Sequence, residues 1–315
     1  MKLYYPKEVL LRHGKEIIDG HTVYLDGALA LKDGKVLESF YQSGKVYDSV
    51  KKFPRYELKN NLLMPGFVAI LKGISEVKNE HLFLASLASK GITSYLFEVS
   101  NNDELELALK KRYLCGFLGI RLVGTNYPLE VYDDSFVKAV VIKDDEDGKM
   151  IPLLQEKNIK VLLNANTANY KGDGYTTVDR NASFNVDHKG YFNYIFEDNK
   201  YAELVSSYDI EDLKATLKLM PRYKRAYAPV LLVSNSEVLL DLYPFFIKAM
   251  KAGLKEVEAS AMLSENILSF YAADEKRAKL TKGYKADVVI VDEKGVILTL
   301  QEGKFYRWEI ILFVF

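Results

Sequence analysis

The sequence is poor in the residues that most often bind metals. Its single cysteine, Cys115, excludes an internal disulfide and a metal site built from several thiolates. It has only four histidines, and no two of them have the spacing of an HxH or HExxH pair. They are His13, His21, His81 and His188. Any function that requires several histidine ligands is therefore disfavoured.

An excess of charge of either sign is also missing, because 43 Lys and Arg residues balance 43 Asp and Glu residues. This balance gives no reason to expect nucleic acid or an acidic membrane as a partner. Long apolar runs are missing too. Ile310–Phe315 is far too short to span a bilayer, and Met1–Arg12 lacks the apolar core of a signal peptide. We therefore expect a cytoplasmic protein with no membrane segment.

Motifs for nucleotide cofactors are absent as well. No glycine-rich dinucleotide fingerprint and no phosphate-binding P-loop occurs at a strand-to-helix turn, so we expect no cofactor. The chain does contain enough apolar sequence for a core, since 49% of its 315 residues are hydrophobic and 27% are charged. This length suggests two domains, or one large barrel with an appendage.

Both ends of the chain have the alternating pattern of β-strands. Near the N-terminus, Asp33-Gly34 is a strong hairpin turn between two such runs. The N-terminal strands are expected at Val23–Asp26, Ala28–Lys32, Lys35–Phe40 and Tyr56–Leu58. The C-terminal strands are expected at Ala286–Asp292, Val296–Leu300 and Phe305–Phe315. We predict that residues 1–61 and 281–315 form one small β-sandwich domain.

Between these ends, short apolar runs alternate with helical segments. Each run has about the length of a buried parallel strand. The strands are expected at Phe67–Leu71, Thr93–Val99, Gly116–Val123, Val137–Ile142, Lys160–Leu163, Ala202–Val205 and Ala228–Val233, with a weaker candidate at Asn181–Val186. The helices are expected at Glu80–Lys90, Asp103–Arg112, Gly148–Lys157, Ile210–Leu219 and Glu237–Ala252. This alternation predicts an α/β protein in which residues 62–280 form a TIM-like (β/α)8 barrel.

Several motifs make the chain resemble the amidohydrolase superfamily. Residues 56–68, which end in Pro-Gly-Phe-Val, are similar to the strand that opens the barrel of that family. Residues 282–292, Lys-Gly-Tyr-Lys-Ala-Asp-Val-Val-Ile-Val-Asp, are similar to its C-terminal signature. The hairpin of residues 28–40 and the Gly-Ile-Thr-Ser of residues 91–94 fit the same family. More narrowly, residues 118–124 and 202–205 resemble N-acetylglucosamine-6-phosphate deacetylases.

The resemblance implies a divalent metal that activates water and an aspartate that acts as general acid and base. In this sequence, the corresponding positions carry residues of other types. They are Leu71 and Gly73 for a histidine pair, Val123 for a glutamate, Arg121, Asn166 and Ala182 for histidines, and Asn235 for the aspartate. Leucine and valine have no lone pair for a cation, and asparagine does not titrate. We therefore expect no bound metal and no catalytic residue.

A polar pocket at the barrel mouth is a further expectation. Alternation along the strands places Arg121 on one face with Val123, and Asn166 on one face with Asn164. The predicted pocket residues are Arg121, Asn164, Asn166, Asn185 and Asn235. One fixed guanidinium among amides could bind a small anionic ligand such as a sugar phosphate. Two alternatives stay open: the polar groups satisfy one another, or Arg121 pairs with Glu98 on the neighbouring strand.

Three functions from different classes remain open. The first is a degenerate amidohydrolase-like protein that has lost hydrolysis and binds a ligand or a partner through its barrel. The second is a deacetylase of amino-sugar phosphates with a site that differs from the family pattern. The third is a structural or regulatory subunit, in a homodimer or paired with an active homologue. Bound metal would favour the second, an ordered polar pocket the first, and a large exposed apolar patch the third.

Overall fold

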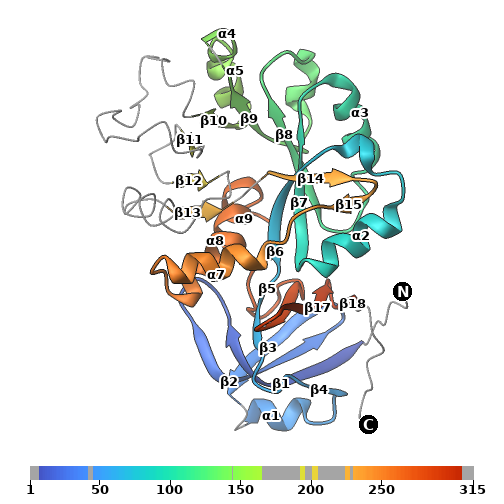
Figure 1. Ribbon diagram of the computed structural model, residues 1–315, viewed down its shortest axis with the longest axis vertical. Coiled ribbons are helices and arrows are strands. Elements are labelled where there is room, and N and C mark those ends of the chain that lie inside the picture. Colours follow the sequence, from blue (N-terminus) through green and yellow to red (C-terminus); the bar gives the residue numbers. More distant parts are fainter. Residues whose placement is uncertain are drawn as a thin grey trace.

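The computed structural model describes residues 7–41, 45–143, 145–164, 192–195, 201–204, 224–227 and 230–306. This described part contains two β-sheets, one below the other in Figure 1. The lower sheet has eight strands from the two ends of the chain, and the upper sheet has ten strands from its middle. No helix among these residues is long and apolar enough to cross a membrane.

The lower sheet, which we call the terminal sheet, joins both ends of the chain. Its strands are β1 (Glu8–Ile17), β2 (Val23–Lys32), β3 (Lys35–Tyr41), β4 (Arg55–Glu57), β5 (Leu62–Pro65), β16 (Val288–Asp292), β17 (Gly295–Gln301) and β18 (Lys304–Tyr306). The strand order is β18-β17-β16-β5-β1-β2-β3, with β4 paired to β1. Because β5 pairs with both β1 and β16, the two ends of the chain share one sheet, as the sequence predicts.

The terminal sheet folds over its own buried face. Leu11 from β1 lies in one hydrophobic cluster with Val288 of β16 and Phe305 of β18. Residues from opposite ends of the strand order therefore share a core, as in the two layers of a sandwich. The turn between β2 and β3 is formed by Asp33 and Gly34, both with positive φ, so the predicted hairpin is confirmed.

The upper sheet, which we call the central sheet, is mixed. Its parallel neighbours are β6 (Phe67–Lys72), β7 (Ile92–Val99), β8 (Phe117–Val123), β9 (Val137–Ile142), β10 (Lys160–Asn164) and β14 (Val230–Ser234). Its shorter strands are β11 (Phe192–Ile195), β12 (Tyr201–Leu204), β13 (Lys224–Tyr227) and β15 (Glu237–Val238). The order is β13-β12-β11-β10-β9-β8-β7-β6-β14-β15. Its two ends are not paired with each other in the described part of the chain, so closure into a barrel stays a prediction.

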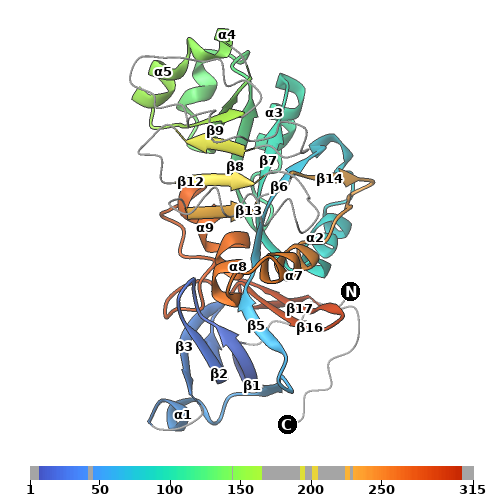
Figure 2. The ribbon, with the colours of Figure 1, turned by 60° about the vertical axis from the view of Figure 1, so that its left-hand side comes forward.

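Helices pack on both faces of the central sheet. They are α2 (Glu80–Ser89), α3 (Asn102–Lys110), α4 (Asp145–Gly148), α5 (Ile151–Glu156), α7 (Tyr243–Lys251), α8 (Glu256–Leu263) and α9 (Glu265–Tyr271), besides α1 (Lys45–Val50) beside the terminal sheet. On one face, the ring of Tyr95 in β7 lies 5.5 Å from that of Phe83 in α2. On the other face, Leu96 of β7 packs in a cluster with Ile267 of α9. Figures 1 and 2 both place α7 and α8 near the place where the two sheets meet.

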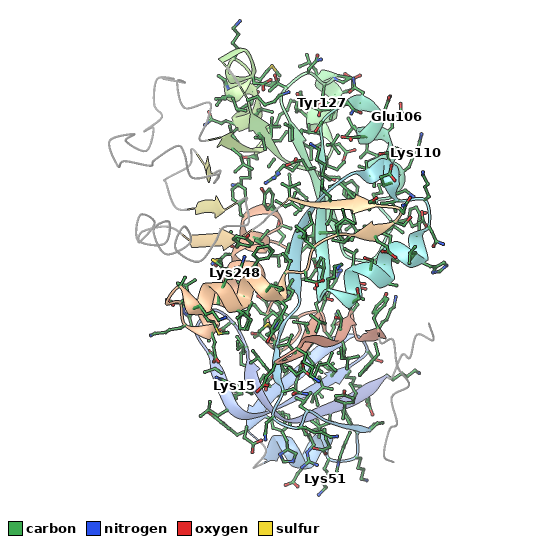
Figure 3. The ribbon with its side chains drawn as sticks, in the orientation of Figure 1. Lys15, Lys51, Glu106, Lys110, Tyr127 and Lys248 are labelled. Carbon is green, nitrogen blue, oxygen red and sulfur yellow. The ribbon has the colours of Figure 1, made fainter. Side chains whose placement is uncertain are left out.

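Helix α3 illustrates how the sequence forms these outer helices. The side chain of Asn101 accepts a hydrogen bond from an amide of the first turn and so caps the helix. Leu105 and Ala108 are buried against the sheet. On the opposite side, Glu106 and Lys110 lie one turn apart and pair at 3.1 Å, at the outer edge of the molecule (Figure 3).

Several expected elements differ in the structure. The helix expected at Glu237–Ala252 is wrong over its first part, because Asn235 and Ser236 form a turn with positive φ and β15 follows it. Helices α8 and α9 were not expected. In α8, residues 259–263 are all buried, so the helix has no polar stripe that would reveal its period. The expected elements at Asn181–Val186 and Ile210–Leu219 lie outside the described residues.

A single glycine separates the two sheets. Strand β5 ends at Pro65 and β6 begins at Phe67. A Cβ atom on the intervening Gly66 would overlap the side chain of Thr93. The Gly66 amide donates to the carbonyl of Asp287 at 3.0 Å. The two sheets therefore approach most closely where only glycine fits.

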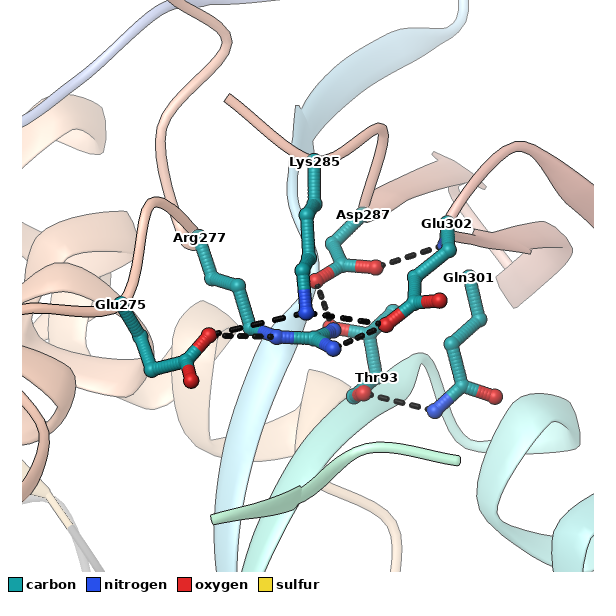
Figure 4. A network of polar contacts seen from close by, with 7 residues as sticks. All are labelled: Thr93, Glu275, Arg277, Lys285, Asp287, Gln301 and Glu302. Atoms are coloured by element: carbon teal, nitrogen blue, oxygen red, sulfur yellow. Dashed lines mark hydrogen bonds and ion pairs between the residues drawn. The ribbon is translucent and has the colours of Figure 1, made fainter. Parts of the chain in front are cut away.

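A network of charges lies beside this junction (Figure 4). Nη1 of Arg277 donates to Oδ2 of Asp287 at 2.6 Å, and Nη2 donates to Glu302. The Glu302 amide donates to Oδ1 of Asp287 at 2.8 Å, so both carboxylate oxygens are bonded. Lys285 and Glu275 complete the network on its more exposed side. Since Asp287 is fully buried, its charge depends on Arg277.

Replacing Asp287 by alanine should lower the free energy of unfolding by about 3 kcal/mol, because part of the Arg277 charge would be buried without its partner. Urea unfolding measures this loss. Lys285→Ala is the matched control, since this lysine is partly exposed, and it should cost no more than about 1 kcal/mol. Equal losses in the two variants would contradict the assignment.

Candidate functional site

The carboxyl ends of the parallel strands β6, β7, β8 and β9 form the candidate site. In sheets of this kind, ligands bind at the carboxyl ends of the strands. Glu98 of β7 is in register with Arg121 of β8, and Lys72 directly follows the pair Leu71–Phe97. Lys72, Glu98 and Arg121 therefore lie in one row across three neighbouring strands. By the alternation of strand side chains, this row is on the face that packs against α9.

Arg121 is the largest fully buried side chain of the protein's described part, with 1% of its surface exposed. Its Nη2 and Nε atoms donate to Oε2 of Glu98 at 2.6 and 3.2 Å, and its Nη1 atom donates to the hydroxyl of Tyr271 at 3.1 Å. The Glu98 side chain is 12% exposed. The alternative in which Arg121 pairs internally with Glu98 is thus confirmed, and this carboxylate neutralises the guanidinium.

Helix α9 brings the phenol of Tyr271 to this pair. Ile267, Leu268 and Tyr271 are buried and lie on one side of the helix, in the cluster that covers the sheet face. The ring of Phe270 contacts that of Tyr271 at 4.7 Å, and Nζ of Lys160 lies 5.9 Å from the Phe270 ring centre. Sequence reasoning missed Tyr271 because it missed α9. The apolar spacing of positions 267, 268 and 271 was the available signal.

Two further side chains hold the loops that follow the strands. The hydroxyl of Tyr127, labelled in Figure 3, donates to the Val99 carbonyl at 2.9 Å, and burial raises the pKa of this phenol. Asp147 accepts from the amide and the hydroxyl of Thr125, both at 2.7 Å, and from the amide of Lys143 at 2.9 Å. The Asp147 carboxylate therefore fastens the loop after β8 to the loop after β9.

The residues at the expected ligand positions do not fit a divalent cation. Leu71 is buried on the face toward α2. Gly73 has a φ of 96°, and a Cβ atom there would lie 2.9 Å from the Val233 carbonyl oxygen, so no side chain fits. Glu98 is bound to Arg121, whose positive charge opposes a cation. In the ranges that the structure describes, no group of three or more His, Cys, Asp or Glu side chains is placed to hold a metal ion.

The other predicted pocket residues are not gathered around the arginine in the described structure. Asn235 is exposed in the turn between β14 and β15, with a φ of 47°, and its amide donates to Oε2 of Glu76 at 3.4 Å. Strands β6 and β7 separate β14 from β8. Asn164 ends β10 with a side chain outside the described part, and Asn166 and Asn185 also lie outside it. Their part in a pocket stays a prediction.

Comparison with solved structures shows which known folds this chain resembles. A mutant N-acetylglucosamine-6-phosphate deacetylase from Mycobacterium smegmatis, in complex with N-acetyl-D-glucosamine-6-phosphate, matches with a TM-score of 0.70 and 12% identity, over 96% of this chain and 100% of that chain. The deacetylase from Pasteurella multocida matches with a TM-score of 0.65 and 13% identity, over 95% and 99% of the two chains. The one from Thermotoga maritima matches with 0.61 and 15%, over 94% and 99%. The fold of this chain is therefore similar to that of these deacetylases.

The amidohydrolase-like fold confirms the resemblance carried by residues 56–68 and 282–292. Enamidase, whose structure is described as a new member of the amidohydrolase superfamily, also matches, with a TM-score of 0.61 and 12% identity over 95% of this chain and 96% of that chain. No protein-family model and no curated protein sequence matches the chain. At such low identity the likeness establishes the fold, and the activity has to be argued from the side chains of this chain.

Replacing Arg121 by alanine should lower the free energy of unfolding by about 3–5 kcal/mol, because Glu98 would keep a mostly buried charge without its partner. Urea unfolding of the purified variant measures the loss. Arg55→Ala removes an exposed guanidinium and should change the stability by less than about 1 kcal/mol. An Arg121→Ala protein as stable as the Arg55→Ala control would disprove a structural role for the ion pair.

Proposed function

We propose that this protein is a degenerate amidohydrolase-like protein that has lost metal-dependent hydrolysis. The observation that carries the proposal is the buried ion pair between Arg121 and Glu98 at the carboxyl ends of the strands. A guanidinium in this row places a fixed positive charge where the family resemblance calls for groups that attract a cation. The occupants of neighbouring positions support the same conclusion, since Leu71 has no lone pair and Gly73 has no side chain.

The chemistry of amide hydrolysis also argues for loss of the reaction. The reaction needs an activated water and a group that transfers protons near neutral pH. Two of the described acids at the strand ends are held by the protein: Glu98 is bound by Arg121, and Asp147 is bound by the amides of Thr125 and Lys143. Each carboxylate already accepts strong hydrogen bonds from the protein, which hold it in a structural role.

We extend the proposal to the architecture. The central sheet would close into a (β/α)8 barrel, because β6 to β10 and β14 are consecutive parallel neighbours and the deacetylases of this fold match over nearly their whole length. The terminal sheet would then be the β-sandwich domain of residues 1–61 and 281–315.

A small anionic ligand such as a sugar phosphate is the proposed occupant of the strand ends. Since Arg121 is neutralised by Glu98, other cations must recognise the anion. Lys72 ends β6 and Lys143 directly follows β9, and both side chains are exposed. By strand alternation, Lys72 and Lys143 share the face that carries Val68 and Val141. Strands β7 and β8 lie between these two lysines, so each ammonium group would attract a phosphate as a separate point charge along this edge.

The loss of hydrolysis is tested by metal analysis of protein purified without chelator, combined with an assay for acetate release. We expect well under one zinc, iron or manganese per chain, and no release of acetate from N-acetylglucosamine 6-phosphate when these metals are added. An active deacetylase serves as the positive control. One bound metal per chain together with acetate release would overturn the proposal in favour of a deacetylase with a different site.

The anion site is tested by calorimetry with N-acetylglucosamine 6-phosphate and with inorganic phosphate. The double variant Lys72→Ala/Lys143→Ala should bind at least about tenfold more weakly than the unmodified protein, since each charged contact contributes about 1.5–3 kcal/mol. Lys251→Ala, an exposed lysine on α7, is the control and should bind normally. Equal binding by the double variant and the control would remove Lys72 and Lys143 from the site.

A further inference from the structure

A buried glutamate in the terminal sheet has no ionic partner among the residues that the structure describes. Glu16 lies in β1 with 1% of its surface exposed. Its Oε1 atom lies 3.0 Å from Oγ of Ser39 in β3, and its Oε2 atom has no hydrogen-bond partner in the described part of the chain. A buried carboxylate in such surroundings would be costly, because a buried charge needs compensating donors.

The hydrogen bonds around Ser39 decide where the proton lies. Oγ of Ser39 is 2.6 Å from the carbonyl oxygen of Leu280, which can only accept. A serine hydroxyl has one hydrogen, and the short contact assigns it to Leu280. The contact between Ser39 and Glu16 then requires Glu16 to donate, so Glu16 carries a proton as a carboxylic acid. The chain of bonds runs from Glu16 through Ser39 to the carbonyl of Leu280.

The surroundings of Glu16 contain little that could stabilise a negative charge. From β2, Gly27 presses against the carboxyl group, since a Cβ atom there would lie 2.5 Å from Oε2, and Tyr24 is the register partner of Glu16. From β5, the register partner is the apolar Leu63. The charged groups near Leu280 have partners of their own: Lys279 pairs with Glu265, and Lys282 with Glu38. Burial, which disfavours the charged form, raises the pKa of Glu16 to about 8.

We propose that Glu16 is a proton-controlled latch between strands β1 and β3 and the segment of residues 278–284 that leads into β16. In the closed state, the carboxylic acid donates to Ser39, which donates to Leu280. When Glu16 releases its proton to solvent, the Ser39 hydroxyl has to turn toward the carboxylate, because no other donor in the described part of the chain contacts it. The bond from Ser39 to Leu280 is then broken. The latch is independent of the proposed loss of hydrolysis.

Because of its position, release of the latch affects a whole segment of chain and not only one side chain. The amide of Leu280 donates to Ile18 at 2.8 Å, and the amide of Gly283 donates to Val36 at 2.8 Å. These bonds hold the same segment against the terminal sheet. Arg277, only three residues before Leu280, belongs to the charge network at the junction of the two sheets. Opening the latch removes one of the hydrogen bonds that hold the segment connecting α9 to β16, and the segment becomes looser.

The direct test is hydrogen exchange of the amides of residues 278–284, corrected for the intrinsic rate, at pH 7 and pH 9. With a pKa of about 8, the ionised fraction of Glu16 rises from about one tenth to about nine tenths over this range. We expect the corrected exchange to rise by about the same factor in the unmodified protein. The Glu16→Gln variant, whose neutral amide can still donate to Ser39, should show no such rise. Equal behaviour of the two proteins would overturn the latch.

Stability gives a second readout with a defined sign. Between pH 4.5 and about 8, the unfolded chain has lost the Glu16 proton while the folded chain keeps it, so stability should fall as the pH rises through this window and level off above it. The midpoint of urea unfolding should therefore decline more for the unmodified protein than for Glu16→Gln. If that variant fails to fold, ¹³C NMR of the Glu16 carboxyl carbon in the unmodified protein decides. A titration near pH 8 supports the latch, and one below pH 6 overturns it.

Discussion

The close approach of the two sheets at Gly66 is the constraint on which the rest of the structure depends. Because β5 belongs to one sheet and β6 to the other, one residue has to cross between them. Contacts on either side of this crossing join side chains of the terminal sheet to backbone carbonyls: the side-chain amide of Gln301 donates to the Thr93 carbonyl at 2.7 Å, and the Thr299 hydroxyl donates to the Ala88 carbonyl at 2.5 Å. Because both acceptors are backbone carbonyls, in β7 and α2, these bonds tie the terminal sheet to fixed points of the central sheet and its helix.

One segment, residues 271–287, contacts each of the three places where charged or titratable side chains are buried. Tyr271 at its start bonds the guanidinium of Arg121, and Arg277 in its middle bonds Asp287 at its end. Leu280 accepts the bond from Ser39. The candidate site, the junction of the sheets and the terminal sheet are therefore joined through one short stretch of chain. A change in the packing of this segment would therefore alter the hydrogen bonds at all three places.

At the strand ends, a guanidinium has consequences that differ from those of a metal ion. A catalytic metal keeps an open position for water or substrate. Arg121 instead has no open side, since it is buried and bonded to Glu98 and Tyr271. Its charge is matched inside the protein and is shielded from a ligand. Among the described residues at the same edge of the sheet, the lysines at positions 72 and 143 are exposed.

The sequence by itself determined the local elements and the kind of fold. The apolar runs at β6 to β10 are predicted by their hydrophobic pattern, and the Asp33-Gly34 turn is predicted by its residue types. Both signals depend only on residues that are neighbours in sequence. The motifs at residues 56–68 and 282–292 indicated the amidohydrolase fold. The pairing of Arg121 with Glu98 was foreseeable as an alternative, because both residues end adjacent strands and share a parity.

Only the tertiary structure decided which charges are matched. Arg121 and Tyr271 are 150 residues apart in sequence, and no local pattern links them. The same holds for Glu16, whose proton follows from the place where Leu280 meets Ser39 across 241 residues. Asn235 was expected in a pocket. It lies instead in the turn that reverses the chain between β14 and β15, where its backbone has a positive φ. A sequence pattern reports the faces of a helix or strand, whereas a hydrogen bond between distant residues exists only after the chain has packed.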